Sequence, residues 1–399
     1  MNKPSVSGES VQVFPPDHHP SLFLLFASFL RMGVTAFGGP AMIAYLRKLA
    51  VSQKKWLDAD TFKDGVALCQ AIPGATAMQM AAYIGLQVQG VRGAFICYVG
   101  FGLPAFLLML VLSSIYARTN ELPTVVAIFS GLQAVVVAIV ANATVSFGKT
   151  ALKNRRSVAI ALVAAALFGI KANPILIILI AGLLGAFLAG RLPAAPGTPP
   201  SAKMSHTTTL LLLFLLASAA GFSLLFLYRK ELFQLALLMS KIDLIAFGGG
   251  FASVPIMFHE IVESRSWMDA STFLNGIILG QFTPGPIVIT ATFVGYMVDG
   301  LLGSLVATVA IFLPSFLILV GVAPWFDRLR AYPLFTKAIS GILCSFVGLL
   351  FTVTVRFALQ VHWDLPHLAL LAAGLVALLL KLDILWVVLA GTAISAFAL

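Results

Sequence analysis

The chain has 399 residues, of which 60% are hydrophobic and 10% are charged, and its mean hydropathy is +1.01. Soluble domains carry about 25% charged residues, so this composition excludes an ordinary water-soluble fold and indicates helices that span a lipid bilayer. The net charge of +10 comes from Lys and Arg residues spread over short connections, as membrane topology requires, and we therefore expect no nucleic-acid partner.

Six apolar segments follow a polar N-terminal tail. Residues 1–20 are polar, and the prolines that precede the first apolar run favour a tail with a retained first helix over a cleaved signal peptide. The first predicted unit, residues 21–190, then holds apolar segments at 22–46, 64–88, 93–117, 122–147, 157–170 and 174–190.

A linker and one additional segment separate this unit from a second one. Residues 191–230 contain a stretch rich in Pro, Ala and Gly and an apolar segment at 208–228. The second predicted unit, residues 231–399, again has six segments, at 232–258, 272–298, 301–324, 334–358, 366–380 and 384–398. The sequence therefore predicts an all-α integral membrane protein with about 13 transmembrane segments, arranged 6+1+6.

The two units repeat each other at an offset of 210 or 211 residues. W-L-D-A-D-T-F-K-D-G-V-A-L-C-Q-A-I-P-G at 56–74 corresponds to W-M-D-A-S-T-F-L-N-G-I-I-L-G-Q-F-T-P-G at 267–285, and F-G-G at 37–39 corresponds to F-G-G at 247–249. Seven predicted crossings separate the loop at 47–63 from the loop at 259–271, which would place them on opposite sides of the membrane. We therefore predict inverted homologous halves, as in many secondary transporters, and the loop charges leave the absolute orientation open.

Matched helix breaks interrupt apolar segments in both halves. Proline removes a helix hydrogen bond and consecutive glycines weaken helical dihedrals, so each break frees backbone groups that lipid cannot satisfy. The half-helix after such a break offers unpaired amides and partial positive charge to an anion, whereas the alternative role of such glycines is close helix packing. The breaks lie at Gly38, Gly39, Gly248 and Gly249, and at Pro73, Gly74, Pro284 and Gly285.

A matched pair of cations lies inside the apolar segments. Arg31 and Lys241 each precede a glycine break by seven residues and lie roughly 14 Å along a helix from its start. A cation at that depth is costly and indicates function, and two symmetric cations would suit a doubly charged anion. The alternative is that each pairs with a carboxylate, for which Asp243 is the candidate beside Lys241.

Polar side chains near the proline-glycine breaks complete the candidate site. Gln70 and Gln281 lie one turn before each break, and Thr283 lies beside the second, where all can donate hydrogen bonds to an oxyanion. Asp64 and Asp243 are the candidates for proton coupling.

Other chemistry is not indicated. The three cysteines are dispersed in apolar segments, His259 and Glu260 are not part of an H-E-x-x-H motif, and no phosphate-binding G-x-x-x-x-G-K-[ST] motif occurs. We expect no metal site, no cofactor, no ATP hydrolysis and no catalytic residues.

The motifs resemble those of the chromate ion transporter family in its long, two-domain form. The resemblance covers nearly the whole chain and is carried by F-G-G-P at 37–40, L-C-Q-A-I-P-G at 68–74, F-G-G-G at 247–250, G-Q-F-T-P-G-P at 280–286, T-F-V-G-Y at 292–296 and I-F-L-P-S-F at 311–316. Similar sequences often have a histidine soon after F-G-G-P and a second proline after the first P-G, where this chain has Met42, Ile43 and Ala75.

The resemblance implies a multi-pass protein of the inner membrane that exports chromate and confers chromate resistance, with sulfate as a candidate competing substrate. Membrane lipid and a second copy of the chain in a homodimer are the other expected partners. A carrier of sulfate or another inorganic anion and a passive anion channel are the alternative functions.

Overall fold

A computed structural model describes residues 20–37, 41–188 and 205–398, and every regular element in these ranges is a helix. The first half contains α1 (Leu22–Thr35), α2 (Ala41–Arg47), η1 (Lys48–Gln53), α3 (Ala59–Ala71), α4 (Thr76–Thr119), α5 (Pro123–Ala151), α6 (Arg155–Gly169) and α7 (Pro174–Leu188). The polar tail before residue 20 and most of the linker lie outside the described residues.

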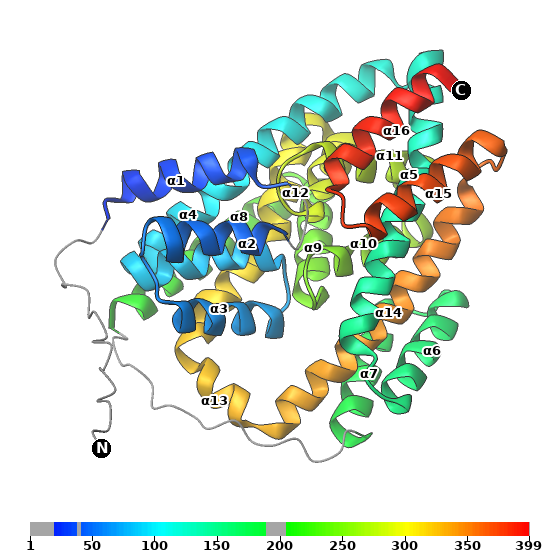
Figure 1. The fold of residues 1–399 in the computed structure, drawn as a ribbon. Coiled ribbons are helices and arrows are strands. Elements are labelled where there is room, and N and C mark those ends of the chain that lie inside the picture. Colours follow the sequence, from blue (N-terminus) through cyan, green and yellow to red (C-terminus); the bar gives the residue numbers. More distant parts are fainter. Residues whose placement is uncertain (1–19, 38–40, 189–204, 399) are drawn as a thin grey trace, which may run out of the picture.

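The second half repeats this order after one extra helix (Figure 1). Helix α8 (Ser205–Tyr228) comes first. It is followed by α9 (Lys230–Ile245), η2 (Gly250–Ala252), α10 (Ser253–Phe258), η3 (His259–Ser264), α11 (Ala270–Phe282), η4 (Ile287–Ile289), α12 (Thr290–Val322), η5 (Ala323–Trp325), α13 (Phe326–Ala331), α14 (Pro333–Gln360), α15 (Leu365–Leu379) and α16 (Ile384–Ala398).

Five of the described helical stretches are long and apolar enough to cross a bilayer. They are Thr76–Thr119, Pro123–Ala151, Thr209–Tyr228, Ile287–Trp325 and Pro333–Gln360, and four shorter apolar helices accompany them at Leu22–Thr35, Pro174–Phe187, Leu365–Leu379 and Ile384–Phe397. An all-α membrane architecture is therefore confirmed.

Helices α3 and α11 each begin at an aspartate that is repeated in the two halves. The carboxylates of Asp58 and Asp269 accept the backbone amides of Thr61 and Thr272, both at 2.8 Å, and so satisfy an otherwise free donor at the helix start. The Thr61 amide also holds the pKa of Asp58 below its usual range. The shared D-A-x-T letters of the repeat thus have a local structural cause.

The proline-glycine breaks turn the chain back on itself. Tyr83 near the start of α4 donates to the Thr61 carbonyl of α3 at 3.3 Å, so these helices form an antiparallel hairpin with Pro73 and Gly74 at its tip. In the second half, a Cβ atom on Gly276 of α11 would meet the ring of Phe293 in α12 at 2.4 Å, which reflects the same close hairpin. The segments predicted at 64–88 and 272–298 therefore each consist of two short antiparallel helices rather than one straight crossing.

A second sharp turn follows each hairpin. Gly90 and Gly300 have φ angles of 64° and 51° and reverse the chain inside α4 and α12, at the boundaries predicted between 88 and 93 and between 298 and 301. Left-handed φ angles of this kind favour glycine because it has no Cβ atom.

Equivalent helices of the two halves pack antiparallel at their centre. We call two residues repeat mates when they occupy equivalent positions in the two halves. The hydroxyl groups of the repeat mates Thr144 in α5 and Thr354 in α14 lie 3.3 Å apart. Four residues further along α5, a Cβ atom on Gly148 would lie 3.8 Å from Val347, which is seven residues earlier in α14. Because α5 and α14 are both long enough to span the membrane and run in opposite directions, the two homologous halves are inverted.

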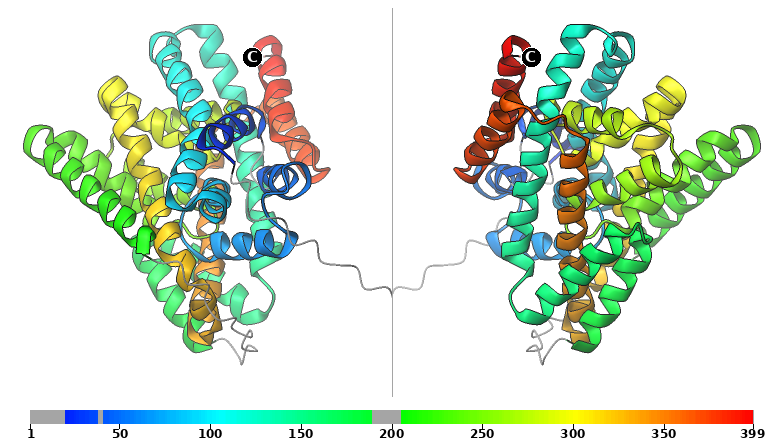
Figure 2. Two further views of the ribbon diagram at one scale, coloured as in Figure 1. Left: turned by 90° about the vertical axis from the view of Figure 1, so that its left-hand side faces the viewer. Right: turned by 90° about the vertical axis from the view of Figure 1, so that its right-hand side faces the viewer.

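The last two helices of each half pack against the long central helix of the other half. Helices α6 and α7 pack on α14, and α15 and α16 pack on α5, so that the two short-helix pairs lie toward opposite ends of the central helices (Figures 1 and 2). Close glycine contacts permit this packing, for example between Gly185 and Gly341 and between Gly348 and Ala161. Helix α8, green in Figure 2, runs along the outside, and its apolar window is not buried.

Candidate functional site

The tip of each hairpin docks on the helix break of the other half. The Gly74 amide donates to the Ala246 carbonyl at 2.9 Å, and the Gly285 amide donates to the Ala36 carbonyl at 3.0 Å. Ala36 and Ala246 are repeat mates at the ends of α1 and α9. The two contacts are thus copies of one contact, which brings both hairpin tips and the ends of α1 and α9 together at the interface between the halves.

Both tip glycines have a structural reason to lack a side chain. Their φ angles are 117° and 112°, which are strained for any other residue. A Cβ atom on Gly74 would lie 2.2 Å from the Cβ of Ser315, and one on Gly285 would lie 3.0 Å from the Cβ of Ala105. Since their amides are already bonded to carbonyl groups, these two N–H groups are not the free anion donors that the sequence suggested.

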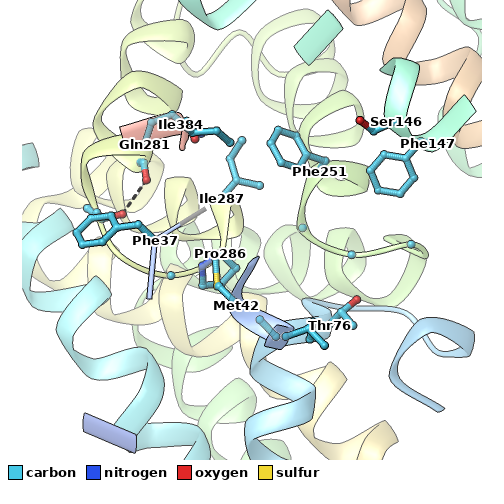
Figure 3. Close-up of a pocket in the computed structure, with 18 of the residues that line it drawn as sticks. Phe37, Met42, Thr76, Ser146, Phe147, Phe251, Gln281, Pro286, Ile287 and Ile384 are labelled. Atoms are coloured by element: carbon cyan, nitrogen blue, oxygen red, sulfur yellow. Dashed lines mark hydrogen bonds between the residues drawn. The ribbon is translucent and has the colours of Figure 1, made fainter. Parts of the chain in front are cut away.

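A cavity of about 500 Å³ lies where the breaks meet (Figure 3). Six of the predicted site residues line it: Gln70, Gly248, Gly249, Gln281, Thr283 and Gly285. They come from the two hairpins and from the break between α9 and α10. Residues next to breaks of both halves therefore line one cavity.

The remaining predicted residues lie elsewhere. Pro73, Gly74 and Pro284 form the hairpin tips but are not part of the cavity lining, and Gly38 and Gly39 lie outside the described residues. Arg31 is an exposed residue of α1, and Lys241 forms a 2.9 Å ion pair with Glu260 rather than with Asp243. The structure does not bring the two cations together in the cavity, because one is exposed and the other is held by η3.

The two carboxylates considered for proton coupling differ in their surroundings. Asp64 is exposed on α3. Asp243 is only 2% exposed, and its Oδ2 accepts the backbone amide of Ser315 at 2.7 Å, directly behind the tip that contains Gly74. The Tyr98 hydroxyl on α4 lies 3.0 Å from the side-chain hydroxyl of Ser315 and donates to the Phe312 carbonyl at 2.7 Å.

The polar groups of the cavity are neutral. No charged side chain occurs among the described residues that line it, whose polar members are Gln70, Thr76, Ser146, Thr150, Gln281 and Thr283. The Thr283 hydroxyl donates to the Gly280 carbonyl at 2.8 Å and is therefore already used. Among the residues that the structure describes, the buried Nε2 atom of Gln281 has no hydrogen-bond partner, which in a folded protein calls for a ligand or a water molecule.

Two helix N-termini also meet the cavity. Thr76 and Ala77 begin α4, Ile287 begins the short turn before α12, and all three residues line the cavity. Neither start has a side-chain cap, so the first-turn amides retain their partial positive charge. Together with the Gln281 amide they provide hydrogen-bond donors suited to an oxyanion.

Apolar walls make up the rest of the cavity and were not predicted. Phe37, Met42, Ile43, Phe251 and Ile287 line it beside the breaks. Met42 and Ile43 follow the F-G-G-P motif directly, and this closeness to a predicted break could have marked them as part of the site. Residues from α5 and α16 also line it, namely Ser146, Phe147, Thr150, Ile384 and Leu385, and they lie outside the motifs that the repeat analysis singled out.

Sequence comparisons assign the chain to a family. Residues 23–186 and 233–396 each match the profile of the family described as chromate transporter. The chain is 44% identical to an uncharacterized transporter of Methanocaldococcus jannaschii over 93% of both chains. It is 32% identical to a chromate transport protein of Cupriavidus metallidurans over 88% of this chain and 86% of the relative.

A further relative is the chromate transport protein of Pseudomonas aeruginosa, 31% identical over 94% of this chain and 91% of the relative. No solved structure matches the chain. The two matched repeats, the inverted helical halves and the near full-length relatives lead to one conclusion: the chain is a multi-pass membrane protein that belongs to the chromate transporter family, in the form that joins two copies of the family's repeat.

Proposed function

We propose that the protein is a secondary transporter that exports chromate, a tetrahedral oxyanion with two negative charges, through the cavity between its halves. The observation that carries the proposal is the meeting of two uncapped helix N-termini and the unpartnered Gln281 amide in that cavity. Each of these groups donates to an anion, and the cavity of about 500 Å³ leaves room for water to accompany the substrate.

A neutral site suits release as well as binding. Helix N-termini and amides stabilise an anion without the strong attraction of a buried guanidinium or ammonium group, so that the substrate can leave again. Arg31 and Lys241 remain candidates for a supporting role, in which they attract the dianion from outside the cavity lining rather than contact it.

The membrane potential supplies a driving force for export. A dianion that leaves a compartment held at about −100 mV gains roughly 4.6 kcal/mol, since one elementary charge gains about 2.3 kcal/mol. Export therefore needs no ATP, which agrees with the lack of a phosphate-binding motif in the sequence. Asp243 is the stronger candidate for additional proton coupling, because it is buried beside a hairpin tip whereas Asp64 is exposed.

A carrier of sulfate or another inorganic anion is the second candidate, because the same donors fit any tetrahedral oxyanion. Met42 and Ile43 line the cavity at positions where similar sequences often have a histidine, and this difference favours testing both substrates. A passive anion channel is the third candidate.

Flux measurements in proteoliposomes test the proposal. Labelled chromate and sulfate are followed while the membrane potential and the pH gradient are set separately. We expect saturable chromate flux that accelerates when the loaded compartment is negative and that shows counter-exchange. Flux that grows linearly with concentration and shows no counter-exchange would indicate a channel, and flux of sulfate alone would reassign the substrate.

A further inference from the structure

The cavity reaches the surface on one side of the inverted repeat. Ser146 and Thr150 of α5 are exposed residues of its lining, as is Gln70 of α3, and Ile384 and Leu385 at the start of α16 are partly exposed lining residues. We call Ser146, Phe147, Thr150, Ile384 and Leu385 the mouth. All of them come from the contact region of α5 with the α15–α16 pair.

Three of the five repeat mates of the mouth are more buried than the mouth residues themselves, while the other two have the same exposure as their counterparts. Ser146 corresponds to Arg356, Phe147 to Phe357, Thr150 to Gln360, Ile384 to Pro174 and Leu385 to Ile175. Phe147 lines the cavity, whereas Phe357 is fully buried and packs on Phe258 with ring centroids 5.2 Å apart. Ile384 is partly exposed and Pro174 is buried. At these two positions the side chain is thus partly exposed at the mouth and buried at its repeat mate.

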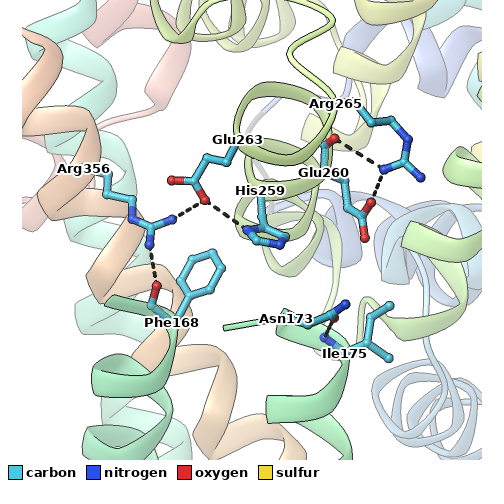
Figure 4. Close-up of polar contacts among 8 residues, drawn as sticks. All are labelled: Phe168, Asn173, Ile175, His259, Glu260, Glu263, Arg265 and Arg356. Atoms are coloured by element: carbon cyan, nitrogen blue, oxygen red, sulfur yellow. Dashed lines mark hydrogen bonds and ion pairs between the residues drawn. The ribbon is translucent and has the colours of Figure 1, made fainter. Parts of the chain in front are cut away.

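A polar cluster holds the closed position together (Figure 4). Arg356 of α14 forms a 2.6 Å ion pair with Glu263 of η3, and the same carboxylate oxygen lies 3.0 Å from Nδ1 of His259. Arg356 also donates to the Phe168 carbonyl of α6 and lies over the Phe168 ring at 4.5 Å. One guanidinium group therefore ties together the α6 end of the first half and two elements of the second half.

The open half has no comparable tie. The repeat mates of Arg356, Glu263 and Phe168 are Ser146, Ser52 and Leu378, and none of these side chains is ionisable. No ion pair joins these three places among the residues that the structure describes. The ion pair is thus present at the buried location around Arg356 and has no equivalent at the mouth.

We infer that the Glu263–Arg356 ion pair, supported by His259 and Phe168, is the gate that closes the cavity toward the membrane face opposite the mouth. Because the halves are inverted, positions that are mates in the repeat face opposite sides of the membrane. The gate opens when α14 and η3 separate, and the substrate then leaves on that side. This inference rests on the proposed transport function, but it concerns the membrane face from which the cavity is accessible and not the identity of the transported anion.

Thiol accessibility tests the gate without any transported substrate. In a background that lacks Cys69, Cys97 and Cys344, Thr76→Cys places one thiol in the cavity. A membrane-impermeant maleimide is then applied from either face of sealed vesicles. With the gate intact we expect labelling mainly from the face of the mouth.

Glu263→Gln and Arg356→Gln should each increase labelling from the opposite face by about tenfold. This change corresponds to a loss of about 1.4 kcal/mol in the free energy that favours the closed gate. Glu231→Gln is the matched control, because it removes one carboxylate from an exposed position at the start of α9 and should leave the labelling unchanged. Unchanged sidedness in both gate variants, with normal melting temperatures, would overturn the inference.

A cross-link covers the case in which the neutral variants fold poorly. In a chain that keeps Thr76 and lacks the native cysteines, a short bis-maleimide between Glu263→Cys and Arg356→Cys should fix the gate shut, so that turnover stops. Undiminished turnover after complete cross-linking would refute the gate even if chromate transport itself is intact. Conversely, failure of chromate flux with altered sidedness would reject the proposed substrate and leave the gate standing.

Discussion

The backbone amide of Gly285 donates to the carbonyl of Ala36, 3.0 Å away in the other half of the protein, and Gly74 makes the mirrored bond to Ala246. Two such equivalent contacts are expected from two-fold symmetry, in which residue i of one copy contacts residue j of the other copy, and residue j of the first copy contacts residue i of the second. They connect the two hairpin tips to the ends of α1 and α9, next to the cavity.

Substitution of the tip glycines should distinguish packing from ligand binding. Gly74→Ala and Gly285→Ala carry similar backbone strain, of order 1–3 kcal/mol, because their φ angles are alike. Gly74→Ala also places its Cβ atom against Ser315 and should lower the melting temperature in detergent further than Gly285→Ala does. Ser315→Gly should restore part of the stability lost by Gly74→Ala. Equal melting temperatures for the two alanine variants would contradict this packing difference.

Gln281 should contribute directly to oxyanion binding. A hydrogen bond to a charged group contributes about 1.5–3 kcal/mol, so Gln281→Ala should weaken chromate affinity by at least about tenfold. Gln281→Glu has nearly the same shape but repels a dianion and should weaken it further. Equilibrium binding of labelled chromate to purified protein measures both effects.

Gln70→Ala serves as the matched comparison, because Gln70 is the repeat mate of Gln281, lines the same cavity and is exposed. We expect a smaller loss of affinity for this variant. Wild-type affinity in Gln281→Ala would remove Gln281 from the site.

Asp243 should carry any proton coupling. Asp243→Asn retains an oxygen that can accept the Ser315 amide, so the fold should persist. In proteoliposomes this variant should lose the dependence of flux on an imposed pH gradient while the dependence on membrane potential remains. Asp64→Asn, exposed on α3, should keep both dependences. A pH-gradient response in Asp243→Asn equal to that of the wild type would exclude coupling through this carboxyl group.

The inverted halves should be visible from outside the membrane. Ser52 and Ser264 are exposed and lie at matched ends of η1 and η3. In a background without native cysteines, single cysteines at these two positions should react with an impermeant reagent from opposite faces of the membrane. Labelling of both from one face would contradict the antiparallel arrangement of α5 and α14.

The sequence alone determined the membrane architecture, the two-fold repeat and the positions of the breaks. The apolar composition requires a bilayer, in which the backbone forms helices. Structure that depends only on neighbouring residues, such as the caps at Asp58 and Asp269 or the turns at Gly90 and Gly300, can also be inferred from the sequence. Six of the predicted site residues reached the cavity because they lie next to those breaks.

Only the tertiary structure decided how the breaks are used. The sequence could not reveal that the segments around Pro73 and Pro284 fold back as hairpins, because one helical period fits a straight and a folded segment equally well. It could not reveal that Lys241 is paired with Glu260, nor that α5 contributes Phe147 to the cavity while its mate Phe357 is sealed. These features depend on contacts between residues far apart in the chain, and packing between the inverted halves places equivalent positions of two homologous repeats in different surroundings.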